Sequence, residues 1–123
     1  MAIAGYQTTE LTLQVNQGDD FSLTVKAWAD AAKTTPLDLS GYSARMQARH
    51  GYDAGSPVLS LTTGGGGITI TGPSGEVAIA ITNAQSAALP AGKLVYDVEL
   101  VSGAGAVTKL IRGTMVVVPE VTR

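Results

Sequence analysis

The sequence predicts an all-β protein, an antiparallel β-sandwich of seven or eight short strands with one short helical turn. Apolar and polar residues alternate with a period of two over most of the chain, which is typical of half-buried strands. Segments rich in glycine, proline or asparagine interrupt this pattern about every ten residues, a spacing that favours a sandwich. The chain has 123 residues, so we expect one domain over residues 1–123.

Two strictly alternating segments, residues 11–15 and 21–25, are the first expected strands. Residues 16–20 (NQGDD) lie between them and are typical of a tight turn. We therefore expect the two segments to pair as an antiparallel hairpin. Two roles are open to this hairpin, completing the sandwich or reaching a neighbouring subunit.

The middle of the chain continues with short alternating segments. Strands are expected at residues 42–49, 58–62, 68–71 and 77–81, with loops at 29–36 and 50–57 and a glycine run at 64–67. In the first of these strands, alternation places Arg45, Gln47 and Arg49 together on one polar side.

One segment changes its period from two to that of a helix. Thr82 and Gln85 have the spacing of a capping box, in which the side chain of each residue accepts a hydrogen bond from the backbone N–H of the other. We expect one short helical turn near residues 83–89, which Pro90 and Gly92 end.

The last third of the chain predicts a long hairpin. Residues 94–100 and 107–118 alternate, and Gly103-Ala104-Gly105 turns the chain between them. Strict alternation along the returning strand would place Lys109 and Arg112 on opposite sides.

Composition excludes several classes of protein. With 45% hydrophobic and 15% charged residues, the chain is not intrinsically disordered. Its net charge of −2 lacks the basic excess of nucleic-acid-binding proteins, and the absence of cysteine excludes disulfides and thiolate metal sites. No apolar run approaches the roughly 20 residues that span a bilayer. We expect no nucleic acid, membrane, metal or cofactor as a partner.

No motif indicates an enzyme. His50 is the only histidine, and Asp53 and Ser56 follow it in one loop. A catalytic triad also needs backbone donors for the oxyanion, and none is recognisable here, so a solvated loop histidine is the favoured interpretation. We expect no catalytic residues.

Two further patterns resemble ligand sites only superficially. Asp19 and Asp20 supply too few acidic oxygens for a calcium loop, and a turn explains them better. The four glycines at 64–67 precede a strand, whereas a phosphate-binding loop precedes a helix and its P-loop form carries a lysine.

Surface binding is the remaining possibility from the residues alone. Trp28 and Tyr52 are candidates for a sugar-stacking platform if they lie exposed in a shallow groove. The polar stripe of Arg45, Gln47 and Arg49 is a solvated face or a partner contact, because arginine is enriched at interfaces.

Several segments in succession resemble a family of small virion proteins of tailed bacteriophages and prophages, and also the N-terminal domain of phage upper-baseplate proteins. The segments are LDLSGYSARMQAR at 37–49, LTT at 61–63, GITI at 67–70, LVYDVEL at 94–100 and VTKLIRGTMVVVPEVTR at 107–123. The resemblance covers about residues 37 to 123, and residues 1–36 match less clearly.

This resemblance implies an immunoglobulin-like sandwich that serves as a non-enzymatic structural protein of the virion, assembled in the cytoplasm of the host bacterium. The implied role is an adaptor or attachment component of the tail, baseplate or fibre region. A head decoration or collar protein and a carbohydrate-binding module for the host surface are the alternatives. Expected partners are copies of itself and other virion proteins. Candidate assembly contacts are Trp28, Arg45, Arg49, His50, Tyr52, Arg112 and Arg123.

Overall fold

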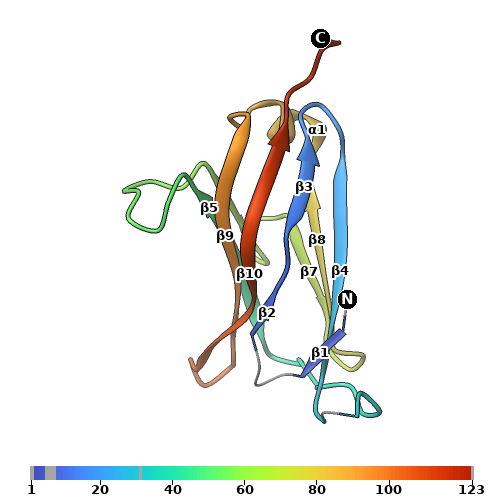
Figure 1. Ribbon diagram of the computed structural model, residues 1–123. Coiled ribbons are helices and arrows are strands. Elements are labelled where there is room, and N and C mark those ends of the chain that lie inside the picture. Colours follow the sequence, from blue (N-terminus) through green and yellow to red (C-terminus); the bar gives the residue numbers. More distant parts are fainter. Residues whose placement is uncertain (1, 5–7, 31, 123) are drawn as a thin grey trace.

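The computed structural model describes residues 2–4, 8–30 and 32–122 of the chain, and two β-sheets facing each other form most of it (Figure 1). Its elements are β1 (Ala2–Ala4), β2 (Thr9–Glu10), β3 (Leu13–Asn16), β4 (Phe21–Trp28), β5 (Ser43–Arg49), β6 (Leu59–Thr62), β7 (Ile68–Thr71), β8 (Glu76–Ile81), α1 (Asn83–Ala87), β9 (Gly92–Val101) and β10 (Val107–Val118). The all-β prediction is confirmed.

The strands divide unequally between the sheets. The first sheet has the order β1-β4-β8-β7, and the second has the order β2-β10-β9-β5-β6, with β3 also on β10. Strands β2 and β3 follow one another along the same edge of β10 and run parallel to it, and β1 runs parallel to β4. The remaining pairs are antiparallel, including the predicted hairpin of β9 and β10.

The core lies between the sheets and is built by the alternation seen in the sequence. Strand β5 buries Ala44, Met46 and Ala48, while the residues between them face outward. Strand β8 contributes Val77 and Ile79 from the opposite sheet, both at most 1% exposed. Each fully buried valine, isoleucine or methionine side chain contributes about 1.5–3 kcal/mol, so burial of this apolar layer is the main stabilising term.

The predicted N-terminal hairpin is wrong. Strand β3 pairs with β10 in the second sheet, whereas β4 pairs with β8 in the first, so residues 17–20 cross from one sheet to the other. Alternation of apolar and polar residues predicts that a strand buries one face, but it does not predict which other strand pairs with that strand. The N-terminal segment thus completes the sandwich: β2 and β3 extend the second sheet and β1 extends the first.

The predicted helical turn and its capping box are confirmed. The Thr82 hydroxyl accepts the backbone N–H of Gln85 at 3.2 Å, and the Gln85 side chain accepts the N–H of Thr82 at 2.9 Å. Helix α1 closes one end of the sandwich beside the turn between β3 and β4 (Figure 1). Its Ser86 is fully buried and bonds that turn, since Ser86 Oγ accepts the N–H of Gly18 and lies 2.7 Å from the Asp19 carbonyl.

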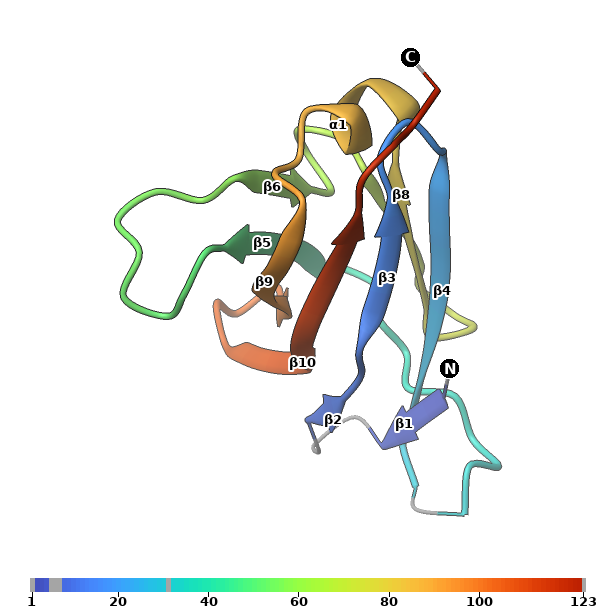
Figure 2. The ribbon, with the colours of Figure 1, turned by 45° about the horizontal axis from the view of Figure 1, so that its top comes forward.

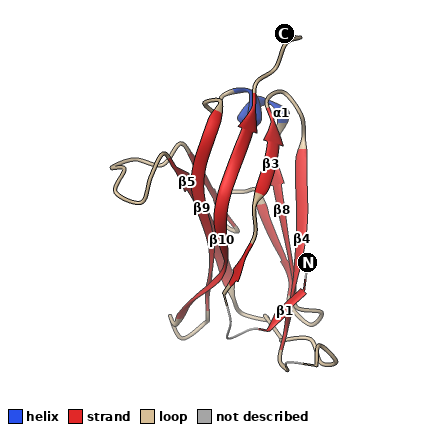
Figure 3. Cartoon of the chain, viewed as in Figure 1, coloured by secondary structure: helices blue, strands red, loops and turns tan. Residues whose placement is uncertain are grey.

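The loop between β5 and β6, drawn in green, projects sideways from the body of the sandwich (Figure 2). Colouring by secondary structure places the other connections mainly at the two ends of the strands (Figure 3). No helix in the described part of the chain is long and apolar enough to cross a membrane.

Candidate partner-binding face

The outer surface of the second sheet carries most of the predicted contact residues. Because Ala44, Met46 and Ala48 are buried, Arg45, Gln47 and Arg49 project from β5 away from the core, as the alternation predicted. Strand β9 lies beside β5 and pairs Arg45 with Glu99 and Gln47 with Asp97 in register. The basic side chains of β5 therefore lie next to the acidic side chains of β9 on the outer face of the sheet.

A β-bulge on β10 completes the face and corrects the predicted alternation. Pairing with β9 shifts register between Lys109 and Ile111, and both Leu110 and Ile111 are buried. The extra residue restarts the alternation, so Lys109 and Arg112 share the outer side instead of lying on opposite sides. A bulge has no strong signal in this sequence, which is why strict alternation failed here.

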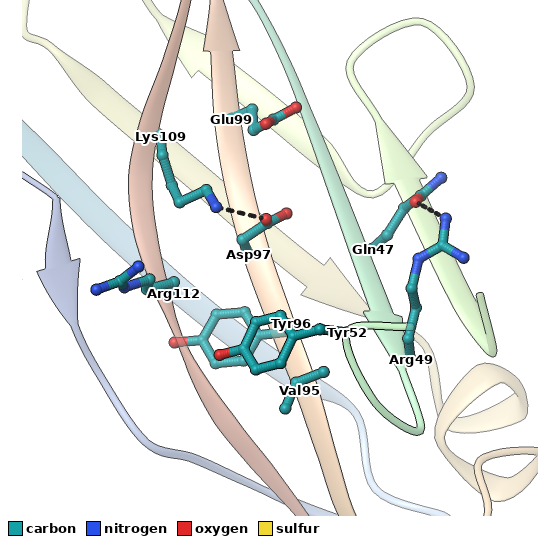
Figure 4. A pocket seen from close by; sticks show the side chains of 9 residues that line it. All are labelled: Gln47, Arg49, Tyr52, Val95, Tyr96, Asp97, Glu99, Lys109 and Arg112. Atoms are coloured by element: carbon teal, nitrogen blue, oxygen red, sulfur yellow. Dashed lines mark hydrogen bonds and ion pairs between the residues drawn. The ribbon is translucent and has the colours of Figure 1, made fainter. Parts of the chain in front are cut away.

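These outward side chains surround a shallow open groove of about 230 Å³ (Figure 4). Its lining residues come from β5, the β5–β6 loop, β9 and β10, and they are Gln47, Arg49, Tyr52, Val95, Tyr96, Asp97, Glu99, Lys109 and Arg112. A neighbouring hollow, lined by Arg45, Gln47, Asp97 and Glu99, shares three of these residues. We call the two together the outer groove.

The charges of the outer groove alternate from strand to strand. Acidic residues on β9 lie between basic residues on β5 and β10, and they form the ion pairs Arg45–Glu99 at 2.8 Å and Lys109–Asp97 at 3.2 Å. At the rim, Arg112 pairs with Glu10 of β2 at 3.1 Å. All three pairs are solvent-exposed in part, and such pairs contribute about 0–1 kcal/mol each to stability. They organise the side chains more than they stabilise the fold.

Arg49 differs from the other basic residues of the outer groove. Its guanidinium donates to the Gln47 side chain and to the Ala54 carbonyl, both at 2.8 Å, and it pairs with no carboxylate among the described residues. The bond to Ala54 ties the β5–β6 loop to the strand. That loop presents Tyr52, whose side chain is 78% exposed although it is aromatic.

The predicted contact residues do not all lie together. Four of them line the outer groove: Arg45, Arg49, Tyr52 and Arg112. His50 lies exposed in the same β5–β6 loop as Tyr52, but it does not line the groove. Trp28 lies on β4 of the first sheet, with the Lys26 ammonium 4.5 Å from its ring centre, and Arg123 lies outside the described residues.

Asp97 and Glu99 are groove residues that the sequence interpretation did not single out. The signal was available, because the alternation of residues 94–100 puts the apolar Leu94, Tyr96 and Val98 together on one side of the strand. Asp97 and Glu99, which alternate with them, therefore had to lie on the opposite, outward side of the strand.

The structure brings no catalytic or metal-binding cluster together in the part of the chain it describes. No hydrogen bond there joins His50 to Asp53 or Ser56, and no group of three acidic, histidine or cysteine side chains has the geometry to hold a metal ion. Asp19 and Asp20 lie in the turn between β3 and β4, and the glycine run links β6 to β7 across the two sheets.

Comparison with known proteins identifies the fold. The sequence matches no protein family model and no curated protein. Among solved structures, the chain is similar to the N-terminal domain of phage TP901-1 ORF48, with a TM-score of 0.55 and 10% sequence identity. The match covers 96% of this chain and 99% of that domain. At this identity the likeness establishes a shared fold.

Proposed function

We propose that this chain is a non-enzymatic structural protein of a tailed-phage virion, and that it attaches to neighbouring proteins through the outer groove. The observation that carries this proposal is the likeness, over nearly the whole of both chains, to a domain of a phage protein. The resemblance of several sequence segments to small phage virion proteins is what first suggested this class of protein. The specific role we propose is an adaptor in the tail, baseplate or fibre region.

The strand order supports the immunoglobulin-like assignment within this proposal. In immunoglobulin domains, strands A, B, E and D form one sheet and C, F and G form the other. Here β4, β8 and β7 correspond in order to B, E and D, and β10, β9 and β5 correspond to G, F and C. The parallel pairing of β1 with β4 departs from the antiparallel rule that the other strands of this sheet follow.

The outer groove has the composition of a protein contact. Tyrosine and arginine are among the residue types that dominate binding energy at interfaces, and the exposed Tyr52 and the half-buried Arg49 both line this groove. A β-sheet face with ordered, alternating charges also favours one register of docking over others.

Immunogold electron microscopy of purified phage particles tests the proposal directly. The chain is tagged with an epitope in its exposed turn at residues 103–105, which leaves the outer groove intact. Particles are then purified from the strain that encodes the chain and labelled with gold-conjugated antibody. We expect label at the tail end. Label on the head would favour the decoration or collar alternative, and absence of the chain from purified particles would contradict a virion role.

The exposure of Tyr52 on a shallow groove favours a second candidate, a carbohydrate-binding role toward the host surface. Saturation-transfer NMR with glucose, galactose, rhamnose and N-acetylglucosamine oligosaccharides tests it. Binding that the Tyr52→Ala variant loses would support this role. No saturation transfer from any of these sugars at millimolar concentration would count against it.

A further inference from the structure

The charges of this molecule are distributed unevenly between the outer groove and the rest of the surface. Four of the eight basic residues line the groove, but only two of the ten acidic residues do. The lining residues therefore carry a net charge of +2, or +1 when Glu10, the partner of Arg112 at the rim, is included, whereas the whole chain carries −2. A basic groove on an acidic protein attracts acidic surfaces.

One end of the sandwich gathers acidic side chains. Asp19 and Asp20 lie in the turn between β3 and β4, and Glu120 follows the end of β10 at the same end of the molecule (Figure 1). A Cβ added to Gly18 would fall 1.6 Å from a Glu120 carboxylate oxygen, so this carboxylate lies directly over the turn. We call Asp19, Asp20 and Glu120 the acidic end. None of the three forms an ion pair with a described residue.

The acidic end is held in place by hydrogen bonds. The Asp20 carboxylate accepts the backbone N–H of Asn83 at 2.8 Å, and the Asp19 carboxylate accepts the Asn16 amide at 3.1 Å. Gln17 accepts the N–H of Glu120 at 3.0 Å and donates to the Leu89 carbonyl at 2.7 Å. The two aspartate carboxylates are held by these bonds and lose little conformational entropy when they bind a basic partner, whereas for Glu120 the bond fixes the backbone.

The outer groove offers the matching cation. Arg49 has no carboxylate partner among the described residues, and its guanidinium points toward Gln47 and away from the Tyr52 ring, which also lines the groove (Figure 4). Within one molecule the acidic end and the groove are different surfaces, one at the helix end and one on the sheet face, and no ion pair joins them among the described residues.

We propose that the outer groove of one copy binds the acidic end of a second copy. This inference rests on the proposed function, because it names the partner of the same surface. Since the two surfaces differ, the contact is head-to-tail, and such contacts build closed rings or open filaments rather than two-fold dimers. Carboxylates of the acidic end pair with Arg49, and Tyr52 contacts the second copy elsewhere in the groove.

Sedimentation equilibrium of the purified full chain at about 20 mM and 500 mM NaCl tests the contact, because screening at the higher salt weakens exposed charge pairs. We expect the mass to rise with concentration at low salt and the dissociation constant to rise at least tenfold at high salt. The triple variant Asp19→Asn, Asp20→Asn and Glu120→Gln keeps the size and the accepting oxygens of these side chains. It should also raise the dissociation constant at least tenfold.

A matched control removes three carboxylates elsewhere. The variant Asp30→Asn, Asp38→Asn and Glu76→Gln changes the net charge equally and leaves both the acidic end and the groove intact, and it should change the dissociation constant less than threefold. On the groove side, Arg49→Gln should weaken association as the acidic-end variant does. Circular dichroism melting of every variant verifies that it is folded.

Three results would overturn this inference. A monomer at every concentration at low salt would mean that the groove binds a different partner. Equal effects of the acidic-end variant and its control would mean a response to net charge alone. Association that Arg49→Gln abolishes but the acidic-end variant leaves unchanged would mean that copies meet face to face. None of these results would contradict the proposed role in the virion, because gold labelling of purified particles tests that role separately.

Discussion

The hydroxyl of Tyr96 donates a hydrogen bond to the backbone carbonyl of Leu11, 85 residues earlier in the chain. Leu11 lies between β2 and β3, and its N–H donates to the Arg112 carbonyl of β10 at 2.9 Å. Tyr96 is only 4% exposed, and in β9 it is in register with Gly113 of β10. One buried phenol thus ties the N-terminal segment to the central strands of the second sheet.

Replacing Tyr96 by phenylalanine should lower the free energy of unfolding by about 1–2 kcal/mol. The change removes the hydroxyl, and the Leu11 carbonyl then lacks its phenol partner. Urea denaturation of both proteins measures the difference. Tyr42→Phe is the control, because the Tyr42 hydroxyl makes no hydrogen bond to a described residue and should cost little. Equal losses in the two variants would contradict the role of this bond.

Alkaline pH should destabilise the protein through the same residue. Burial raises the pKa of Tyr96 from 10.0 to about 12. Above pH 10 the unfolded chain releases the phenol proton while the folded chain retains it, so stability falls as pH rises from about 10 to 12. Thermal melts at pH 9 and pH 11.5 should differ more in the native protein than in Tyr96→Phe. An equal difference in both would place the effect on other groups.

Gly113 should not tolerate a side chain. A Cβ at this position would lie 2.3 Å from the Leu11 carbonyl oxygen, so backbone must move. We expect Gly113→Ala to cost about 1–3 kcal/mol, the range for overpacked sites. Gly55→Ala, where a Cβ meets nothing within 4 Å, should be nearly neutral in the same chemical-denaturation experiment. A stable Gly113→Ala protein would show that β3 can shift away from β10.

Removing residues 116–123 should abolish cooperative unfolding. This deletion takes away buried Val117 and much of the ladder that joins β10 to β3. Loss of one buried valine alone costs about 1.5–3 kcal/mol. Deleting residues 121–123 serves as the control, because Val121 and Thr122 are exposed and should leave the melting temperature unchanged. A shortened protein with the native melting temperature would mean that this segment serves only a partner.

The sequence by itself determined the all-β class, most strand positions, the capped helical turn and the outward stripe of Arg45, Gln47 and Arg49. Each depends on residues near one another in the chain, because strand alternation and helix capping are local properties. For the same reason the outward position of Asp97 and Glu99 was predictable from their own strand.

Only the tertiary structure decided which strands are neighbours. Sequence alternation is the same whether β3 pairs with β4 or with β10, because Leu13 and Val15 would face the shared core from either sheet; the choice depends on backbone pairing with a strand about 100 residues away in the chain. The bulge that brings Lys109 and Arg112 to one face depends on packing Leu110 and Ile111 together. The outer groove joins β5, β9, β10 and the β5–β6 loop, so it exists only after long-range pairing has assembled the second sheet.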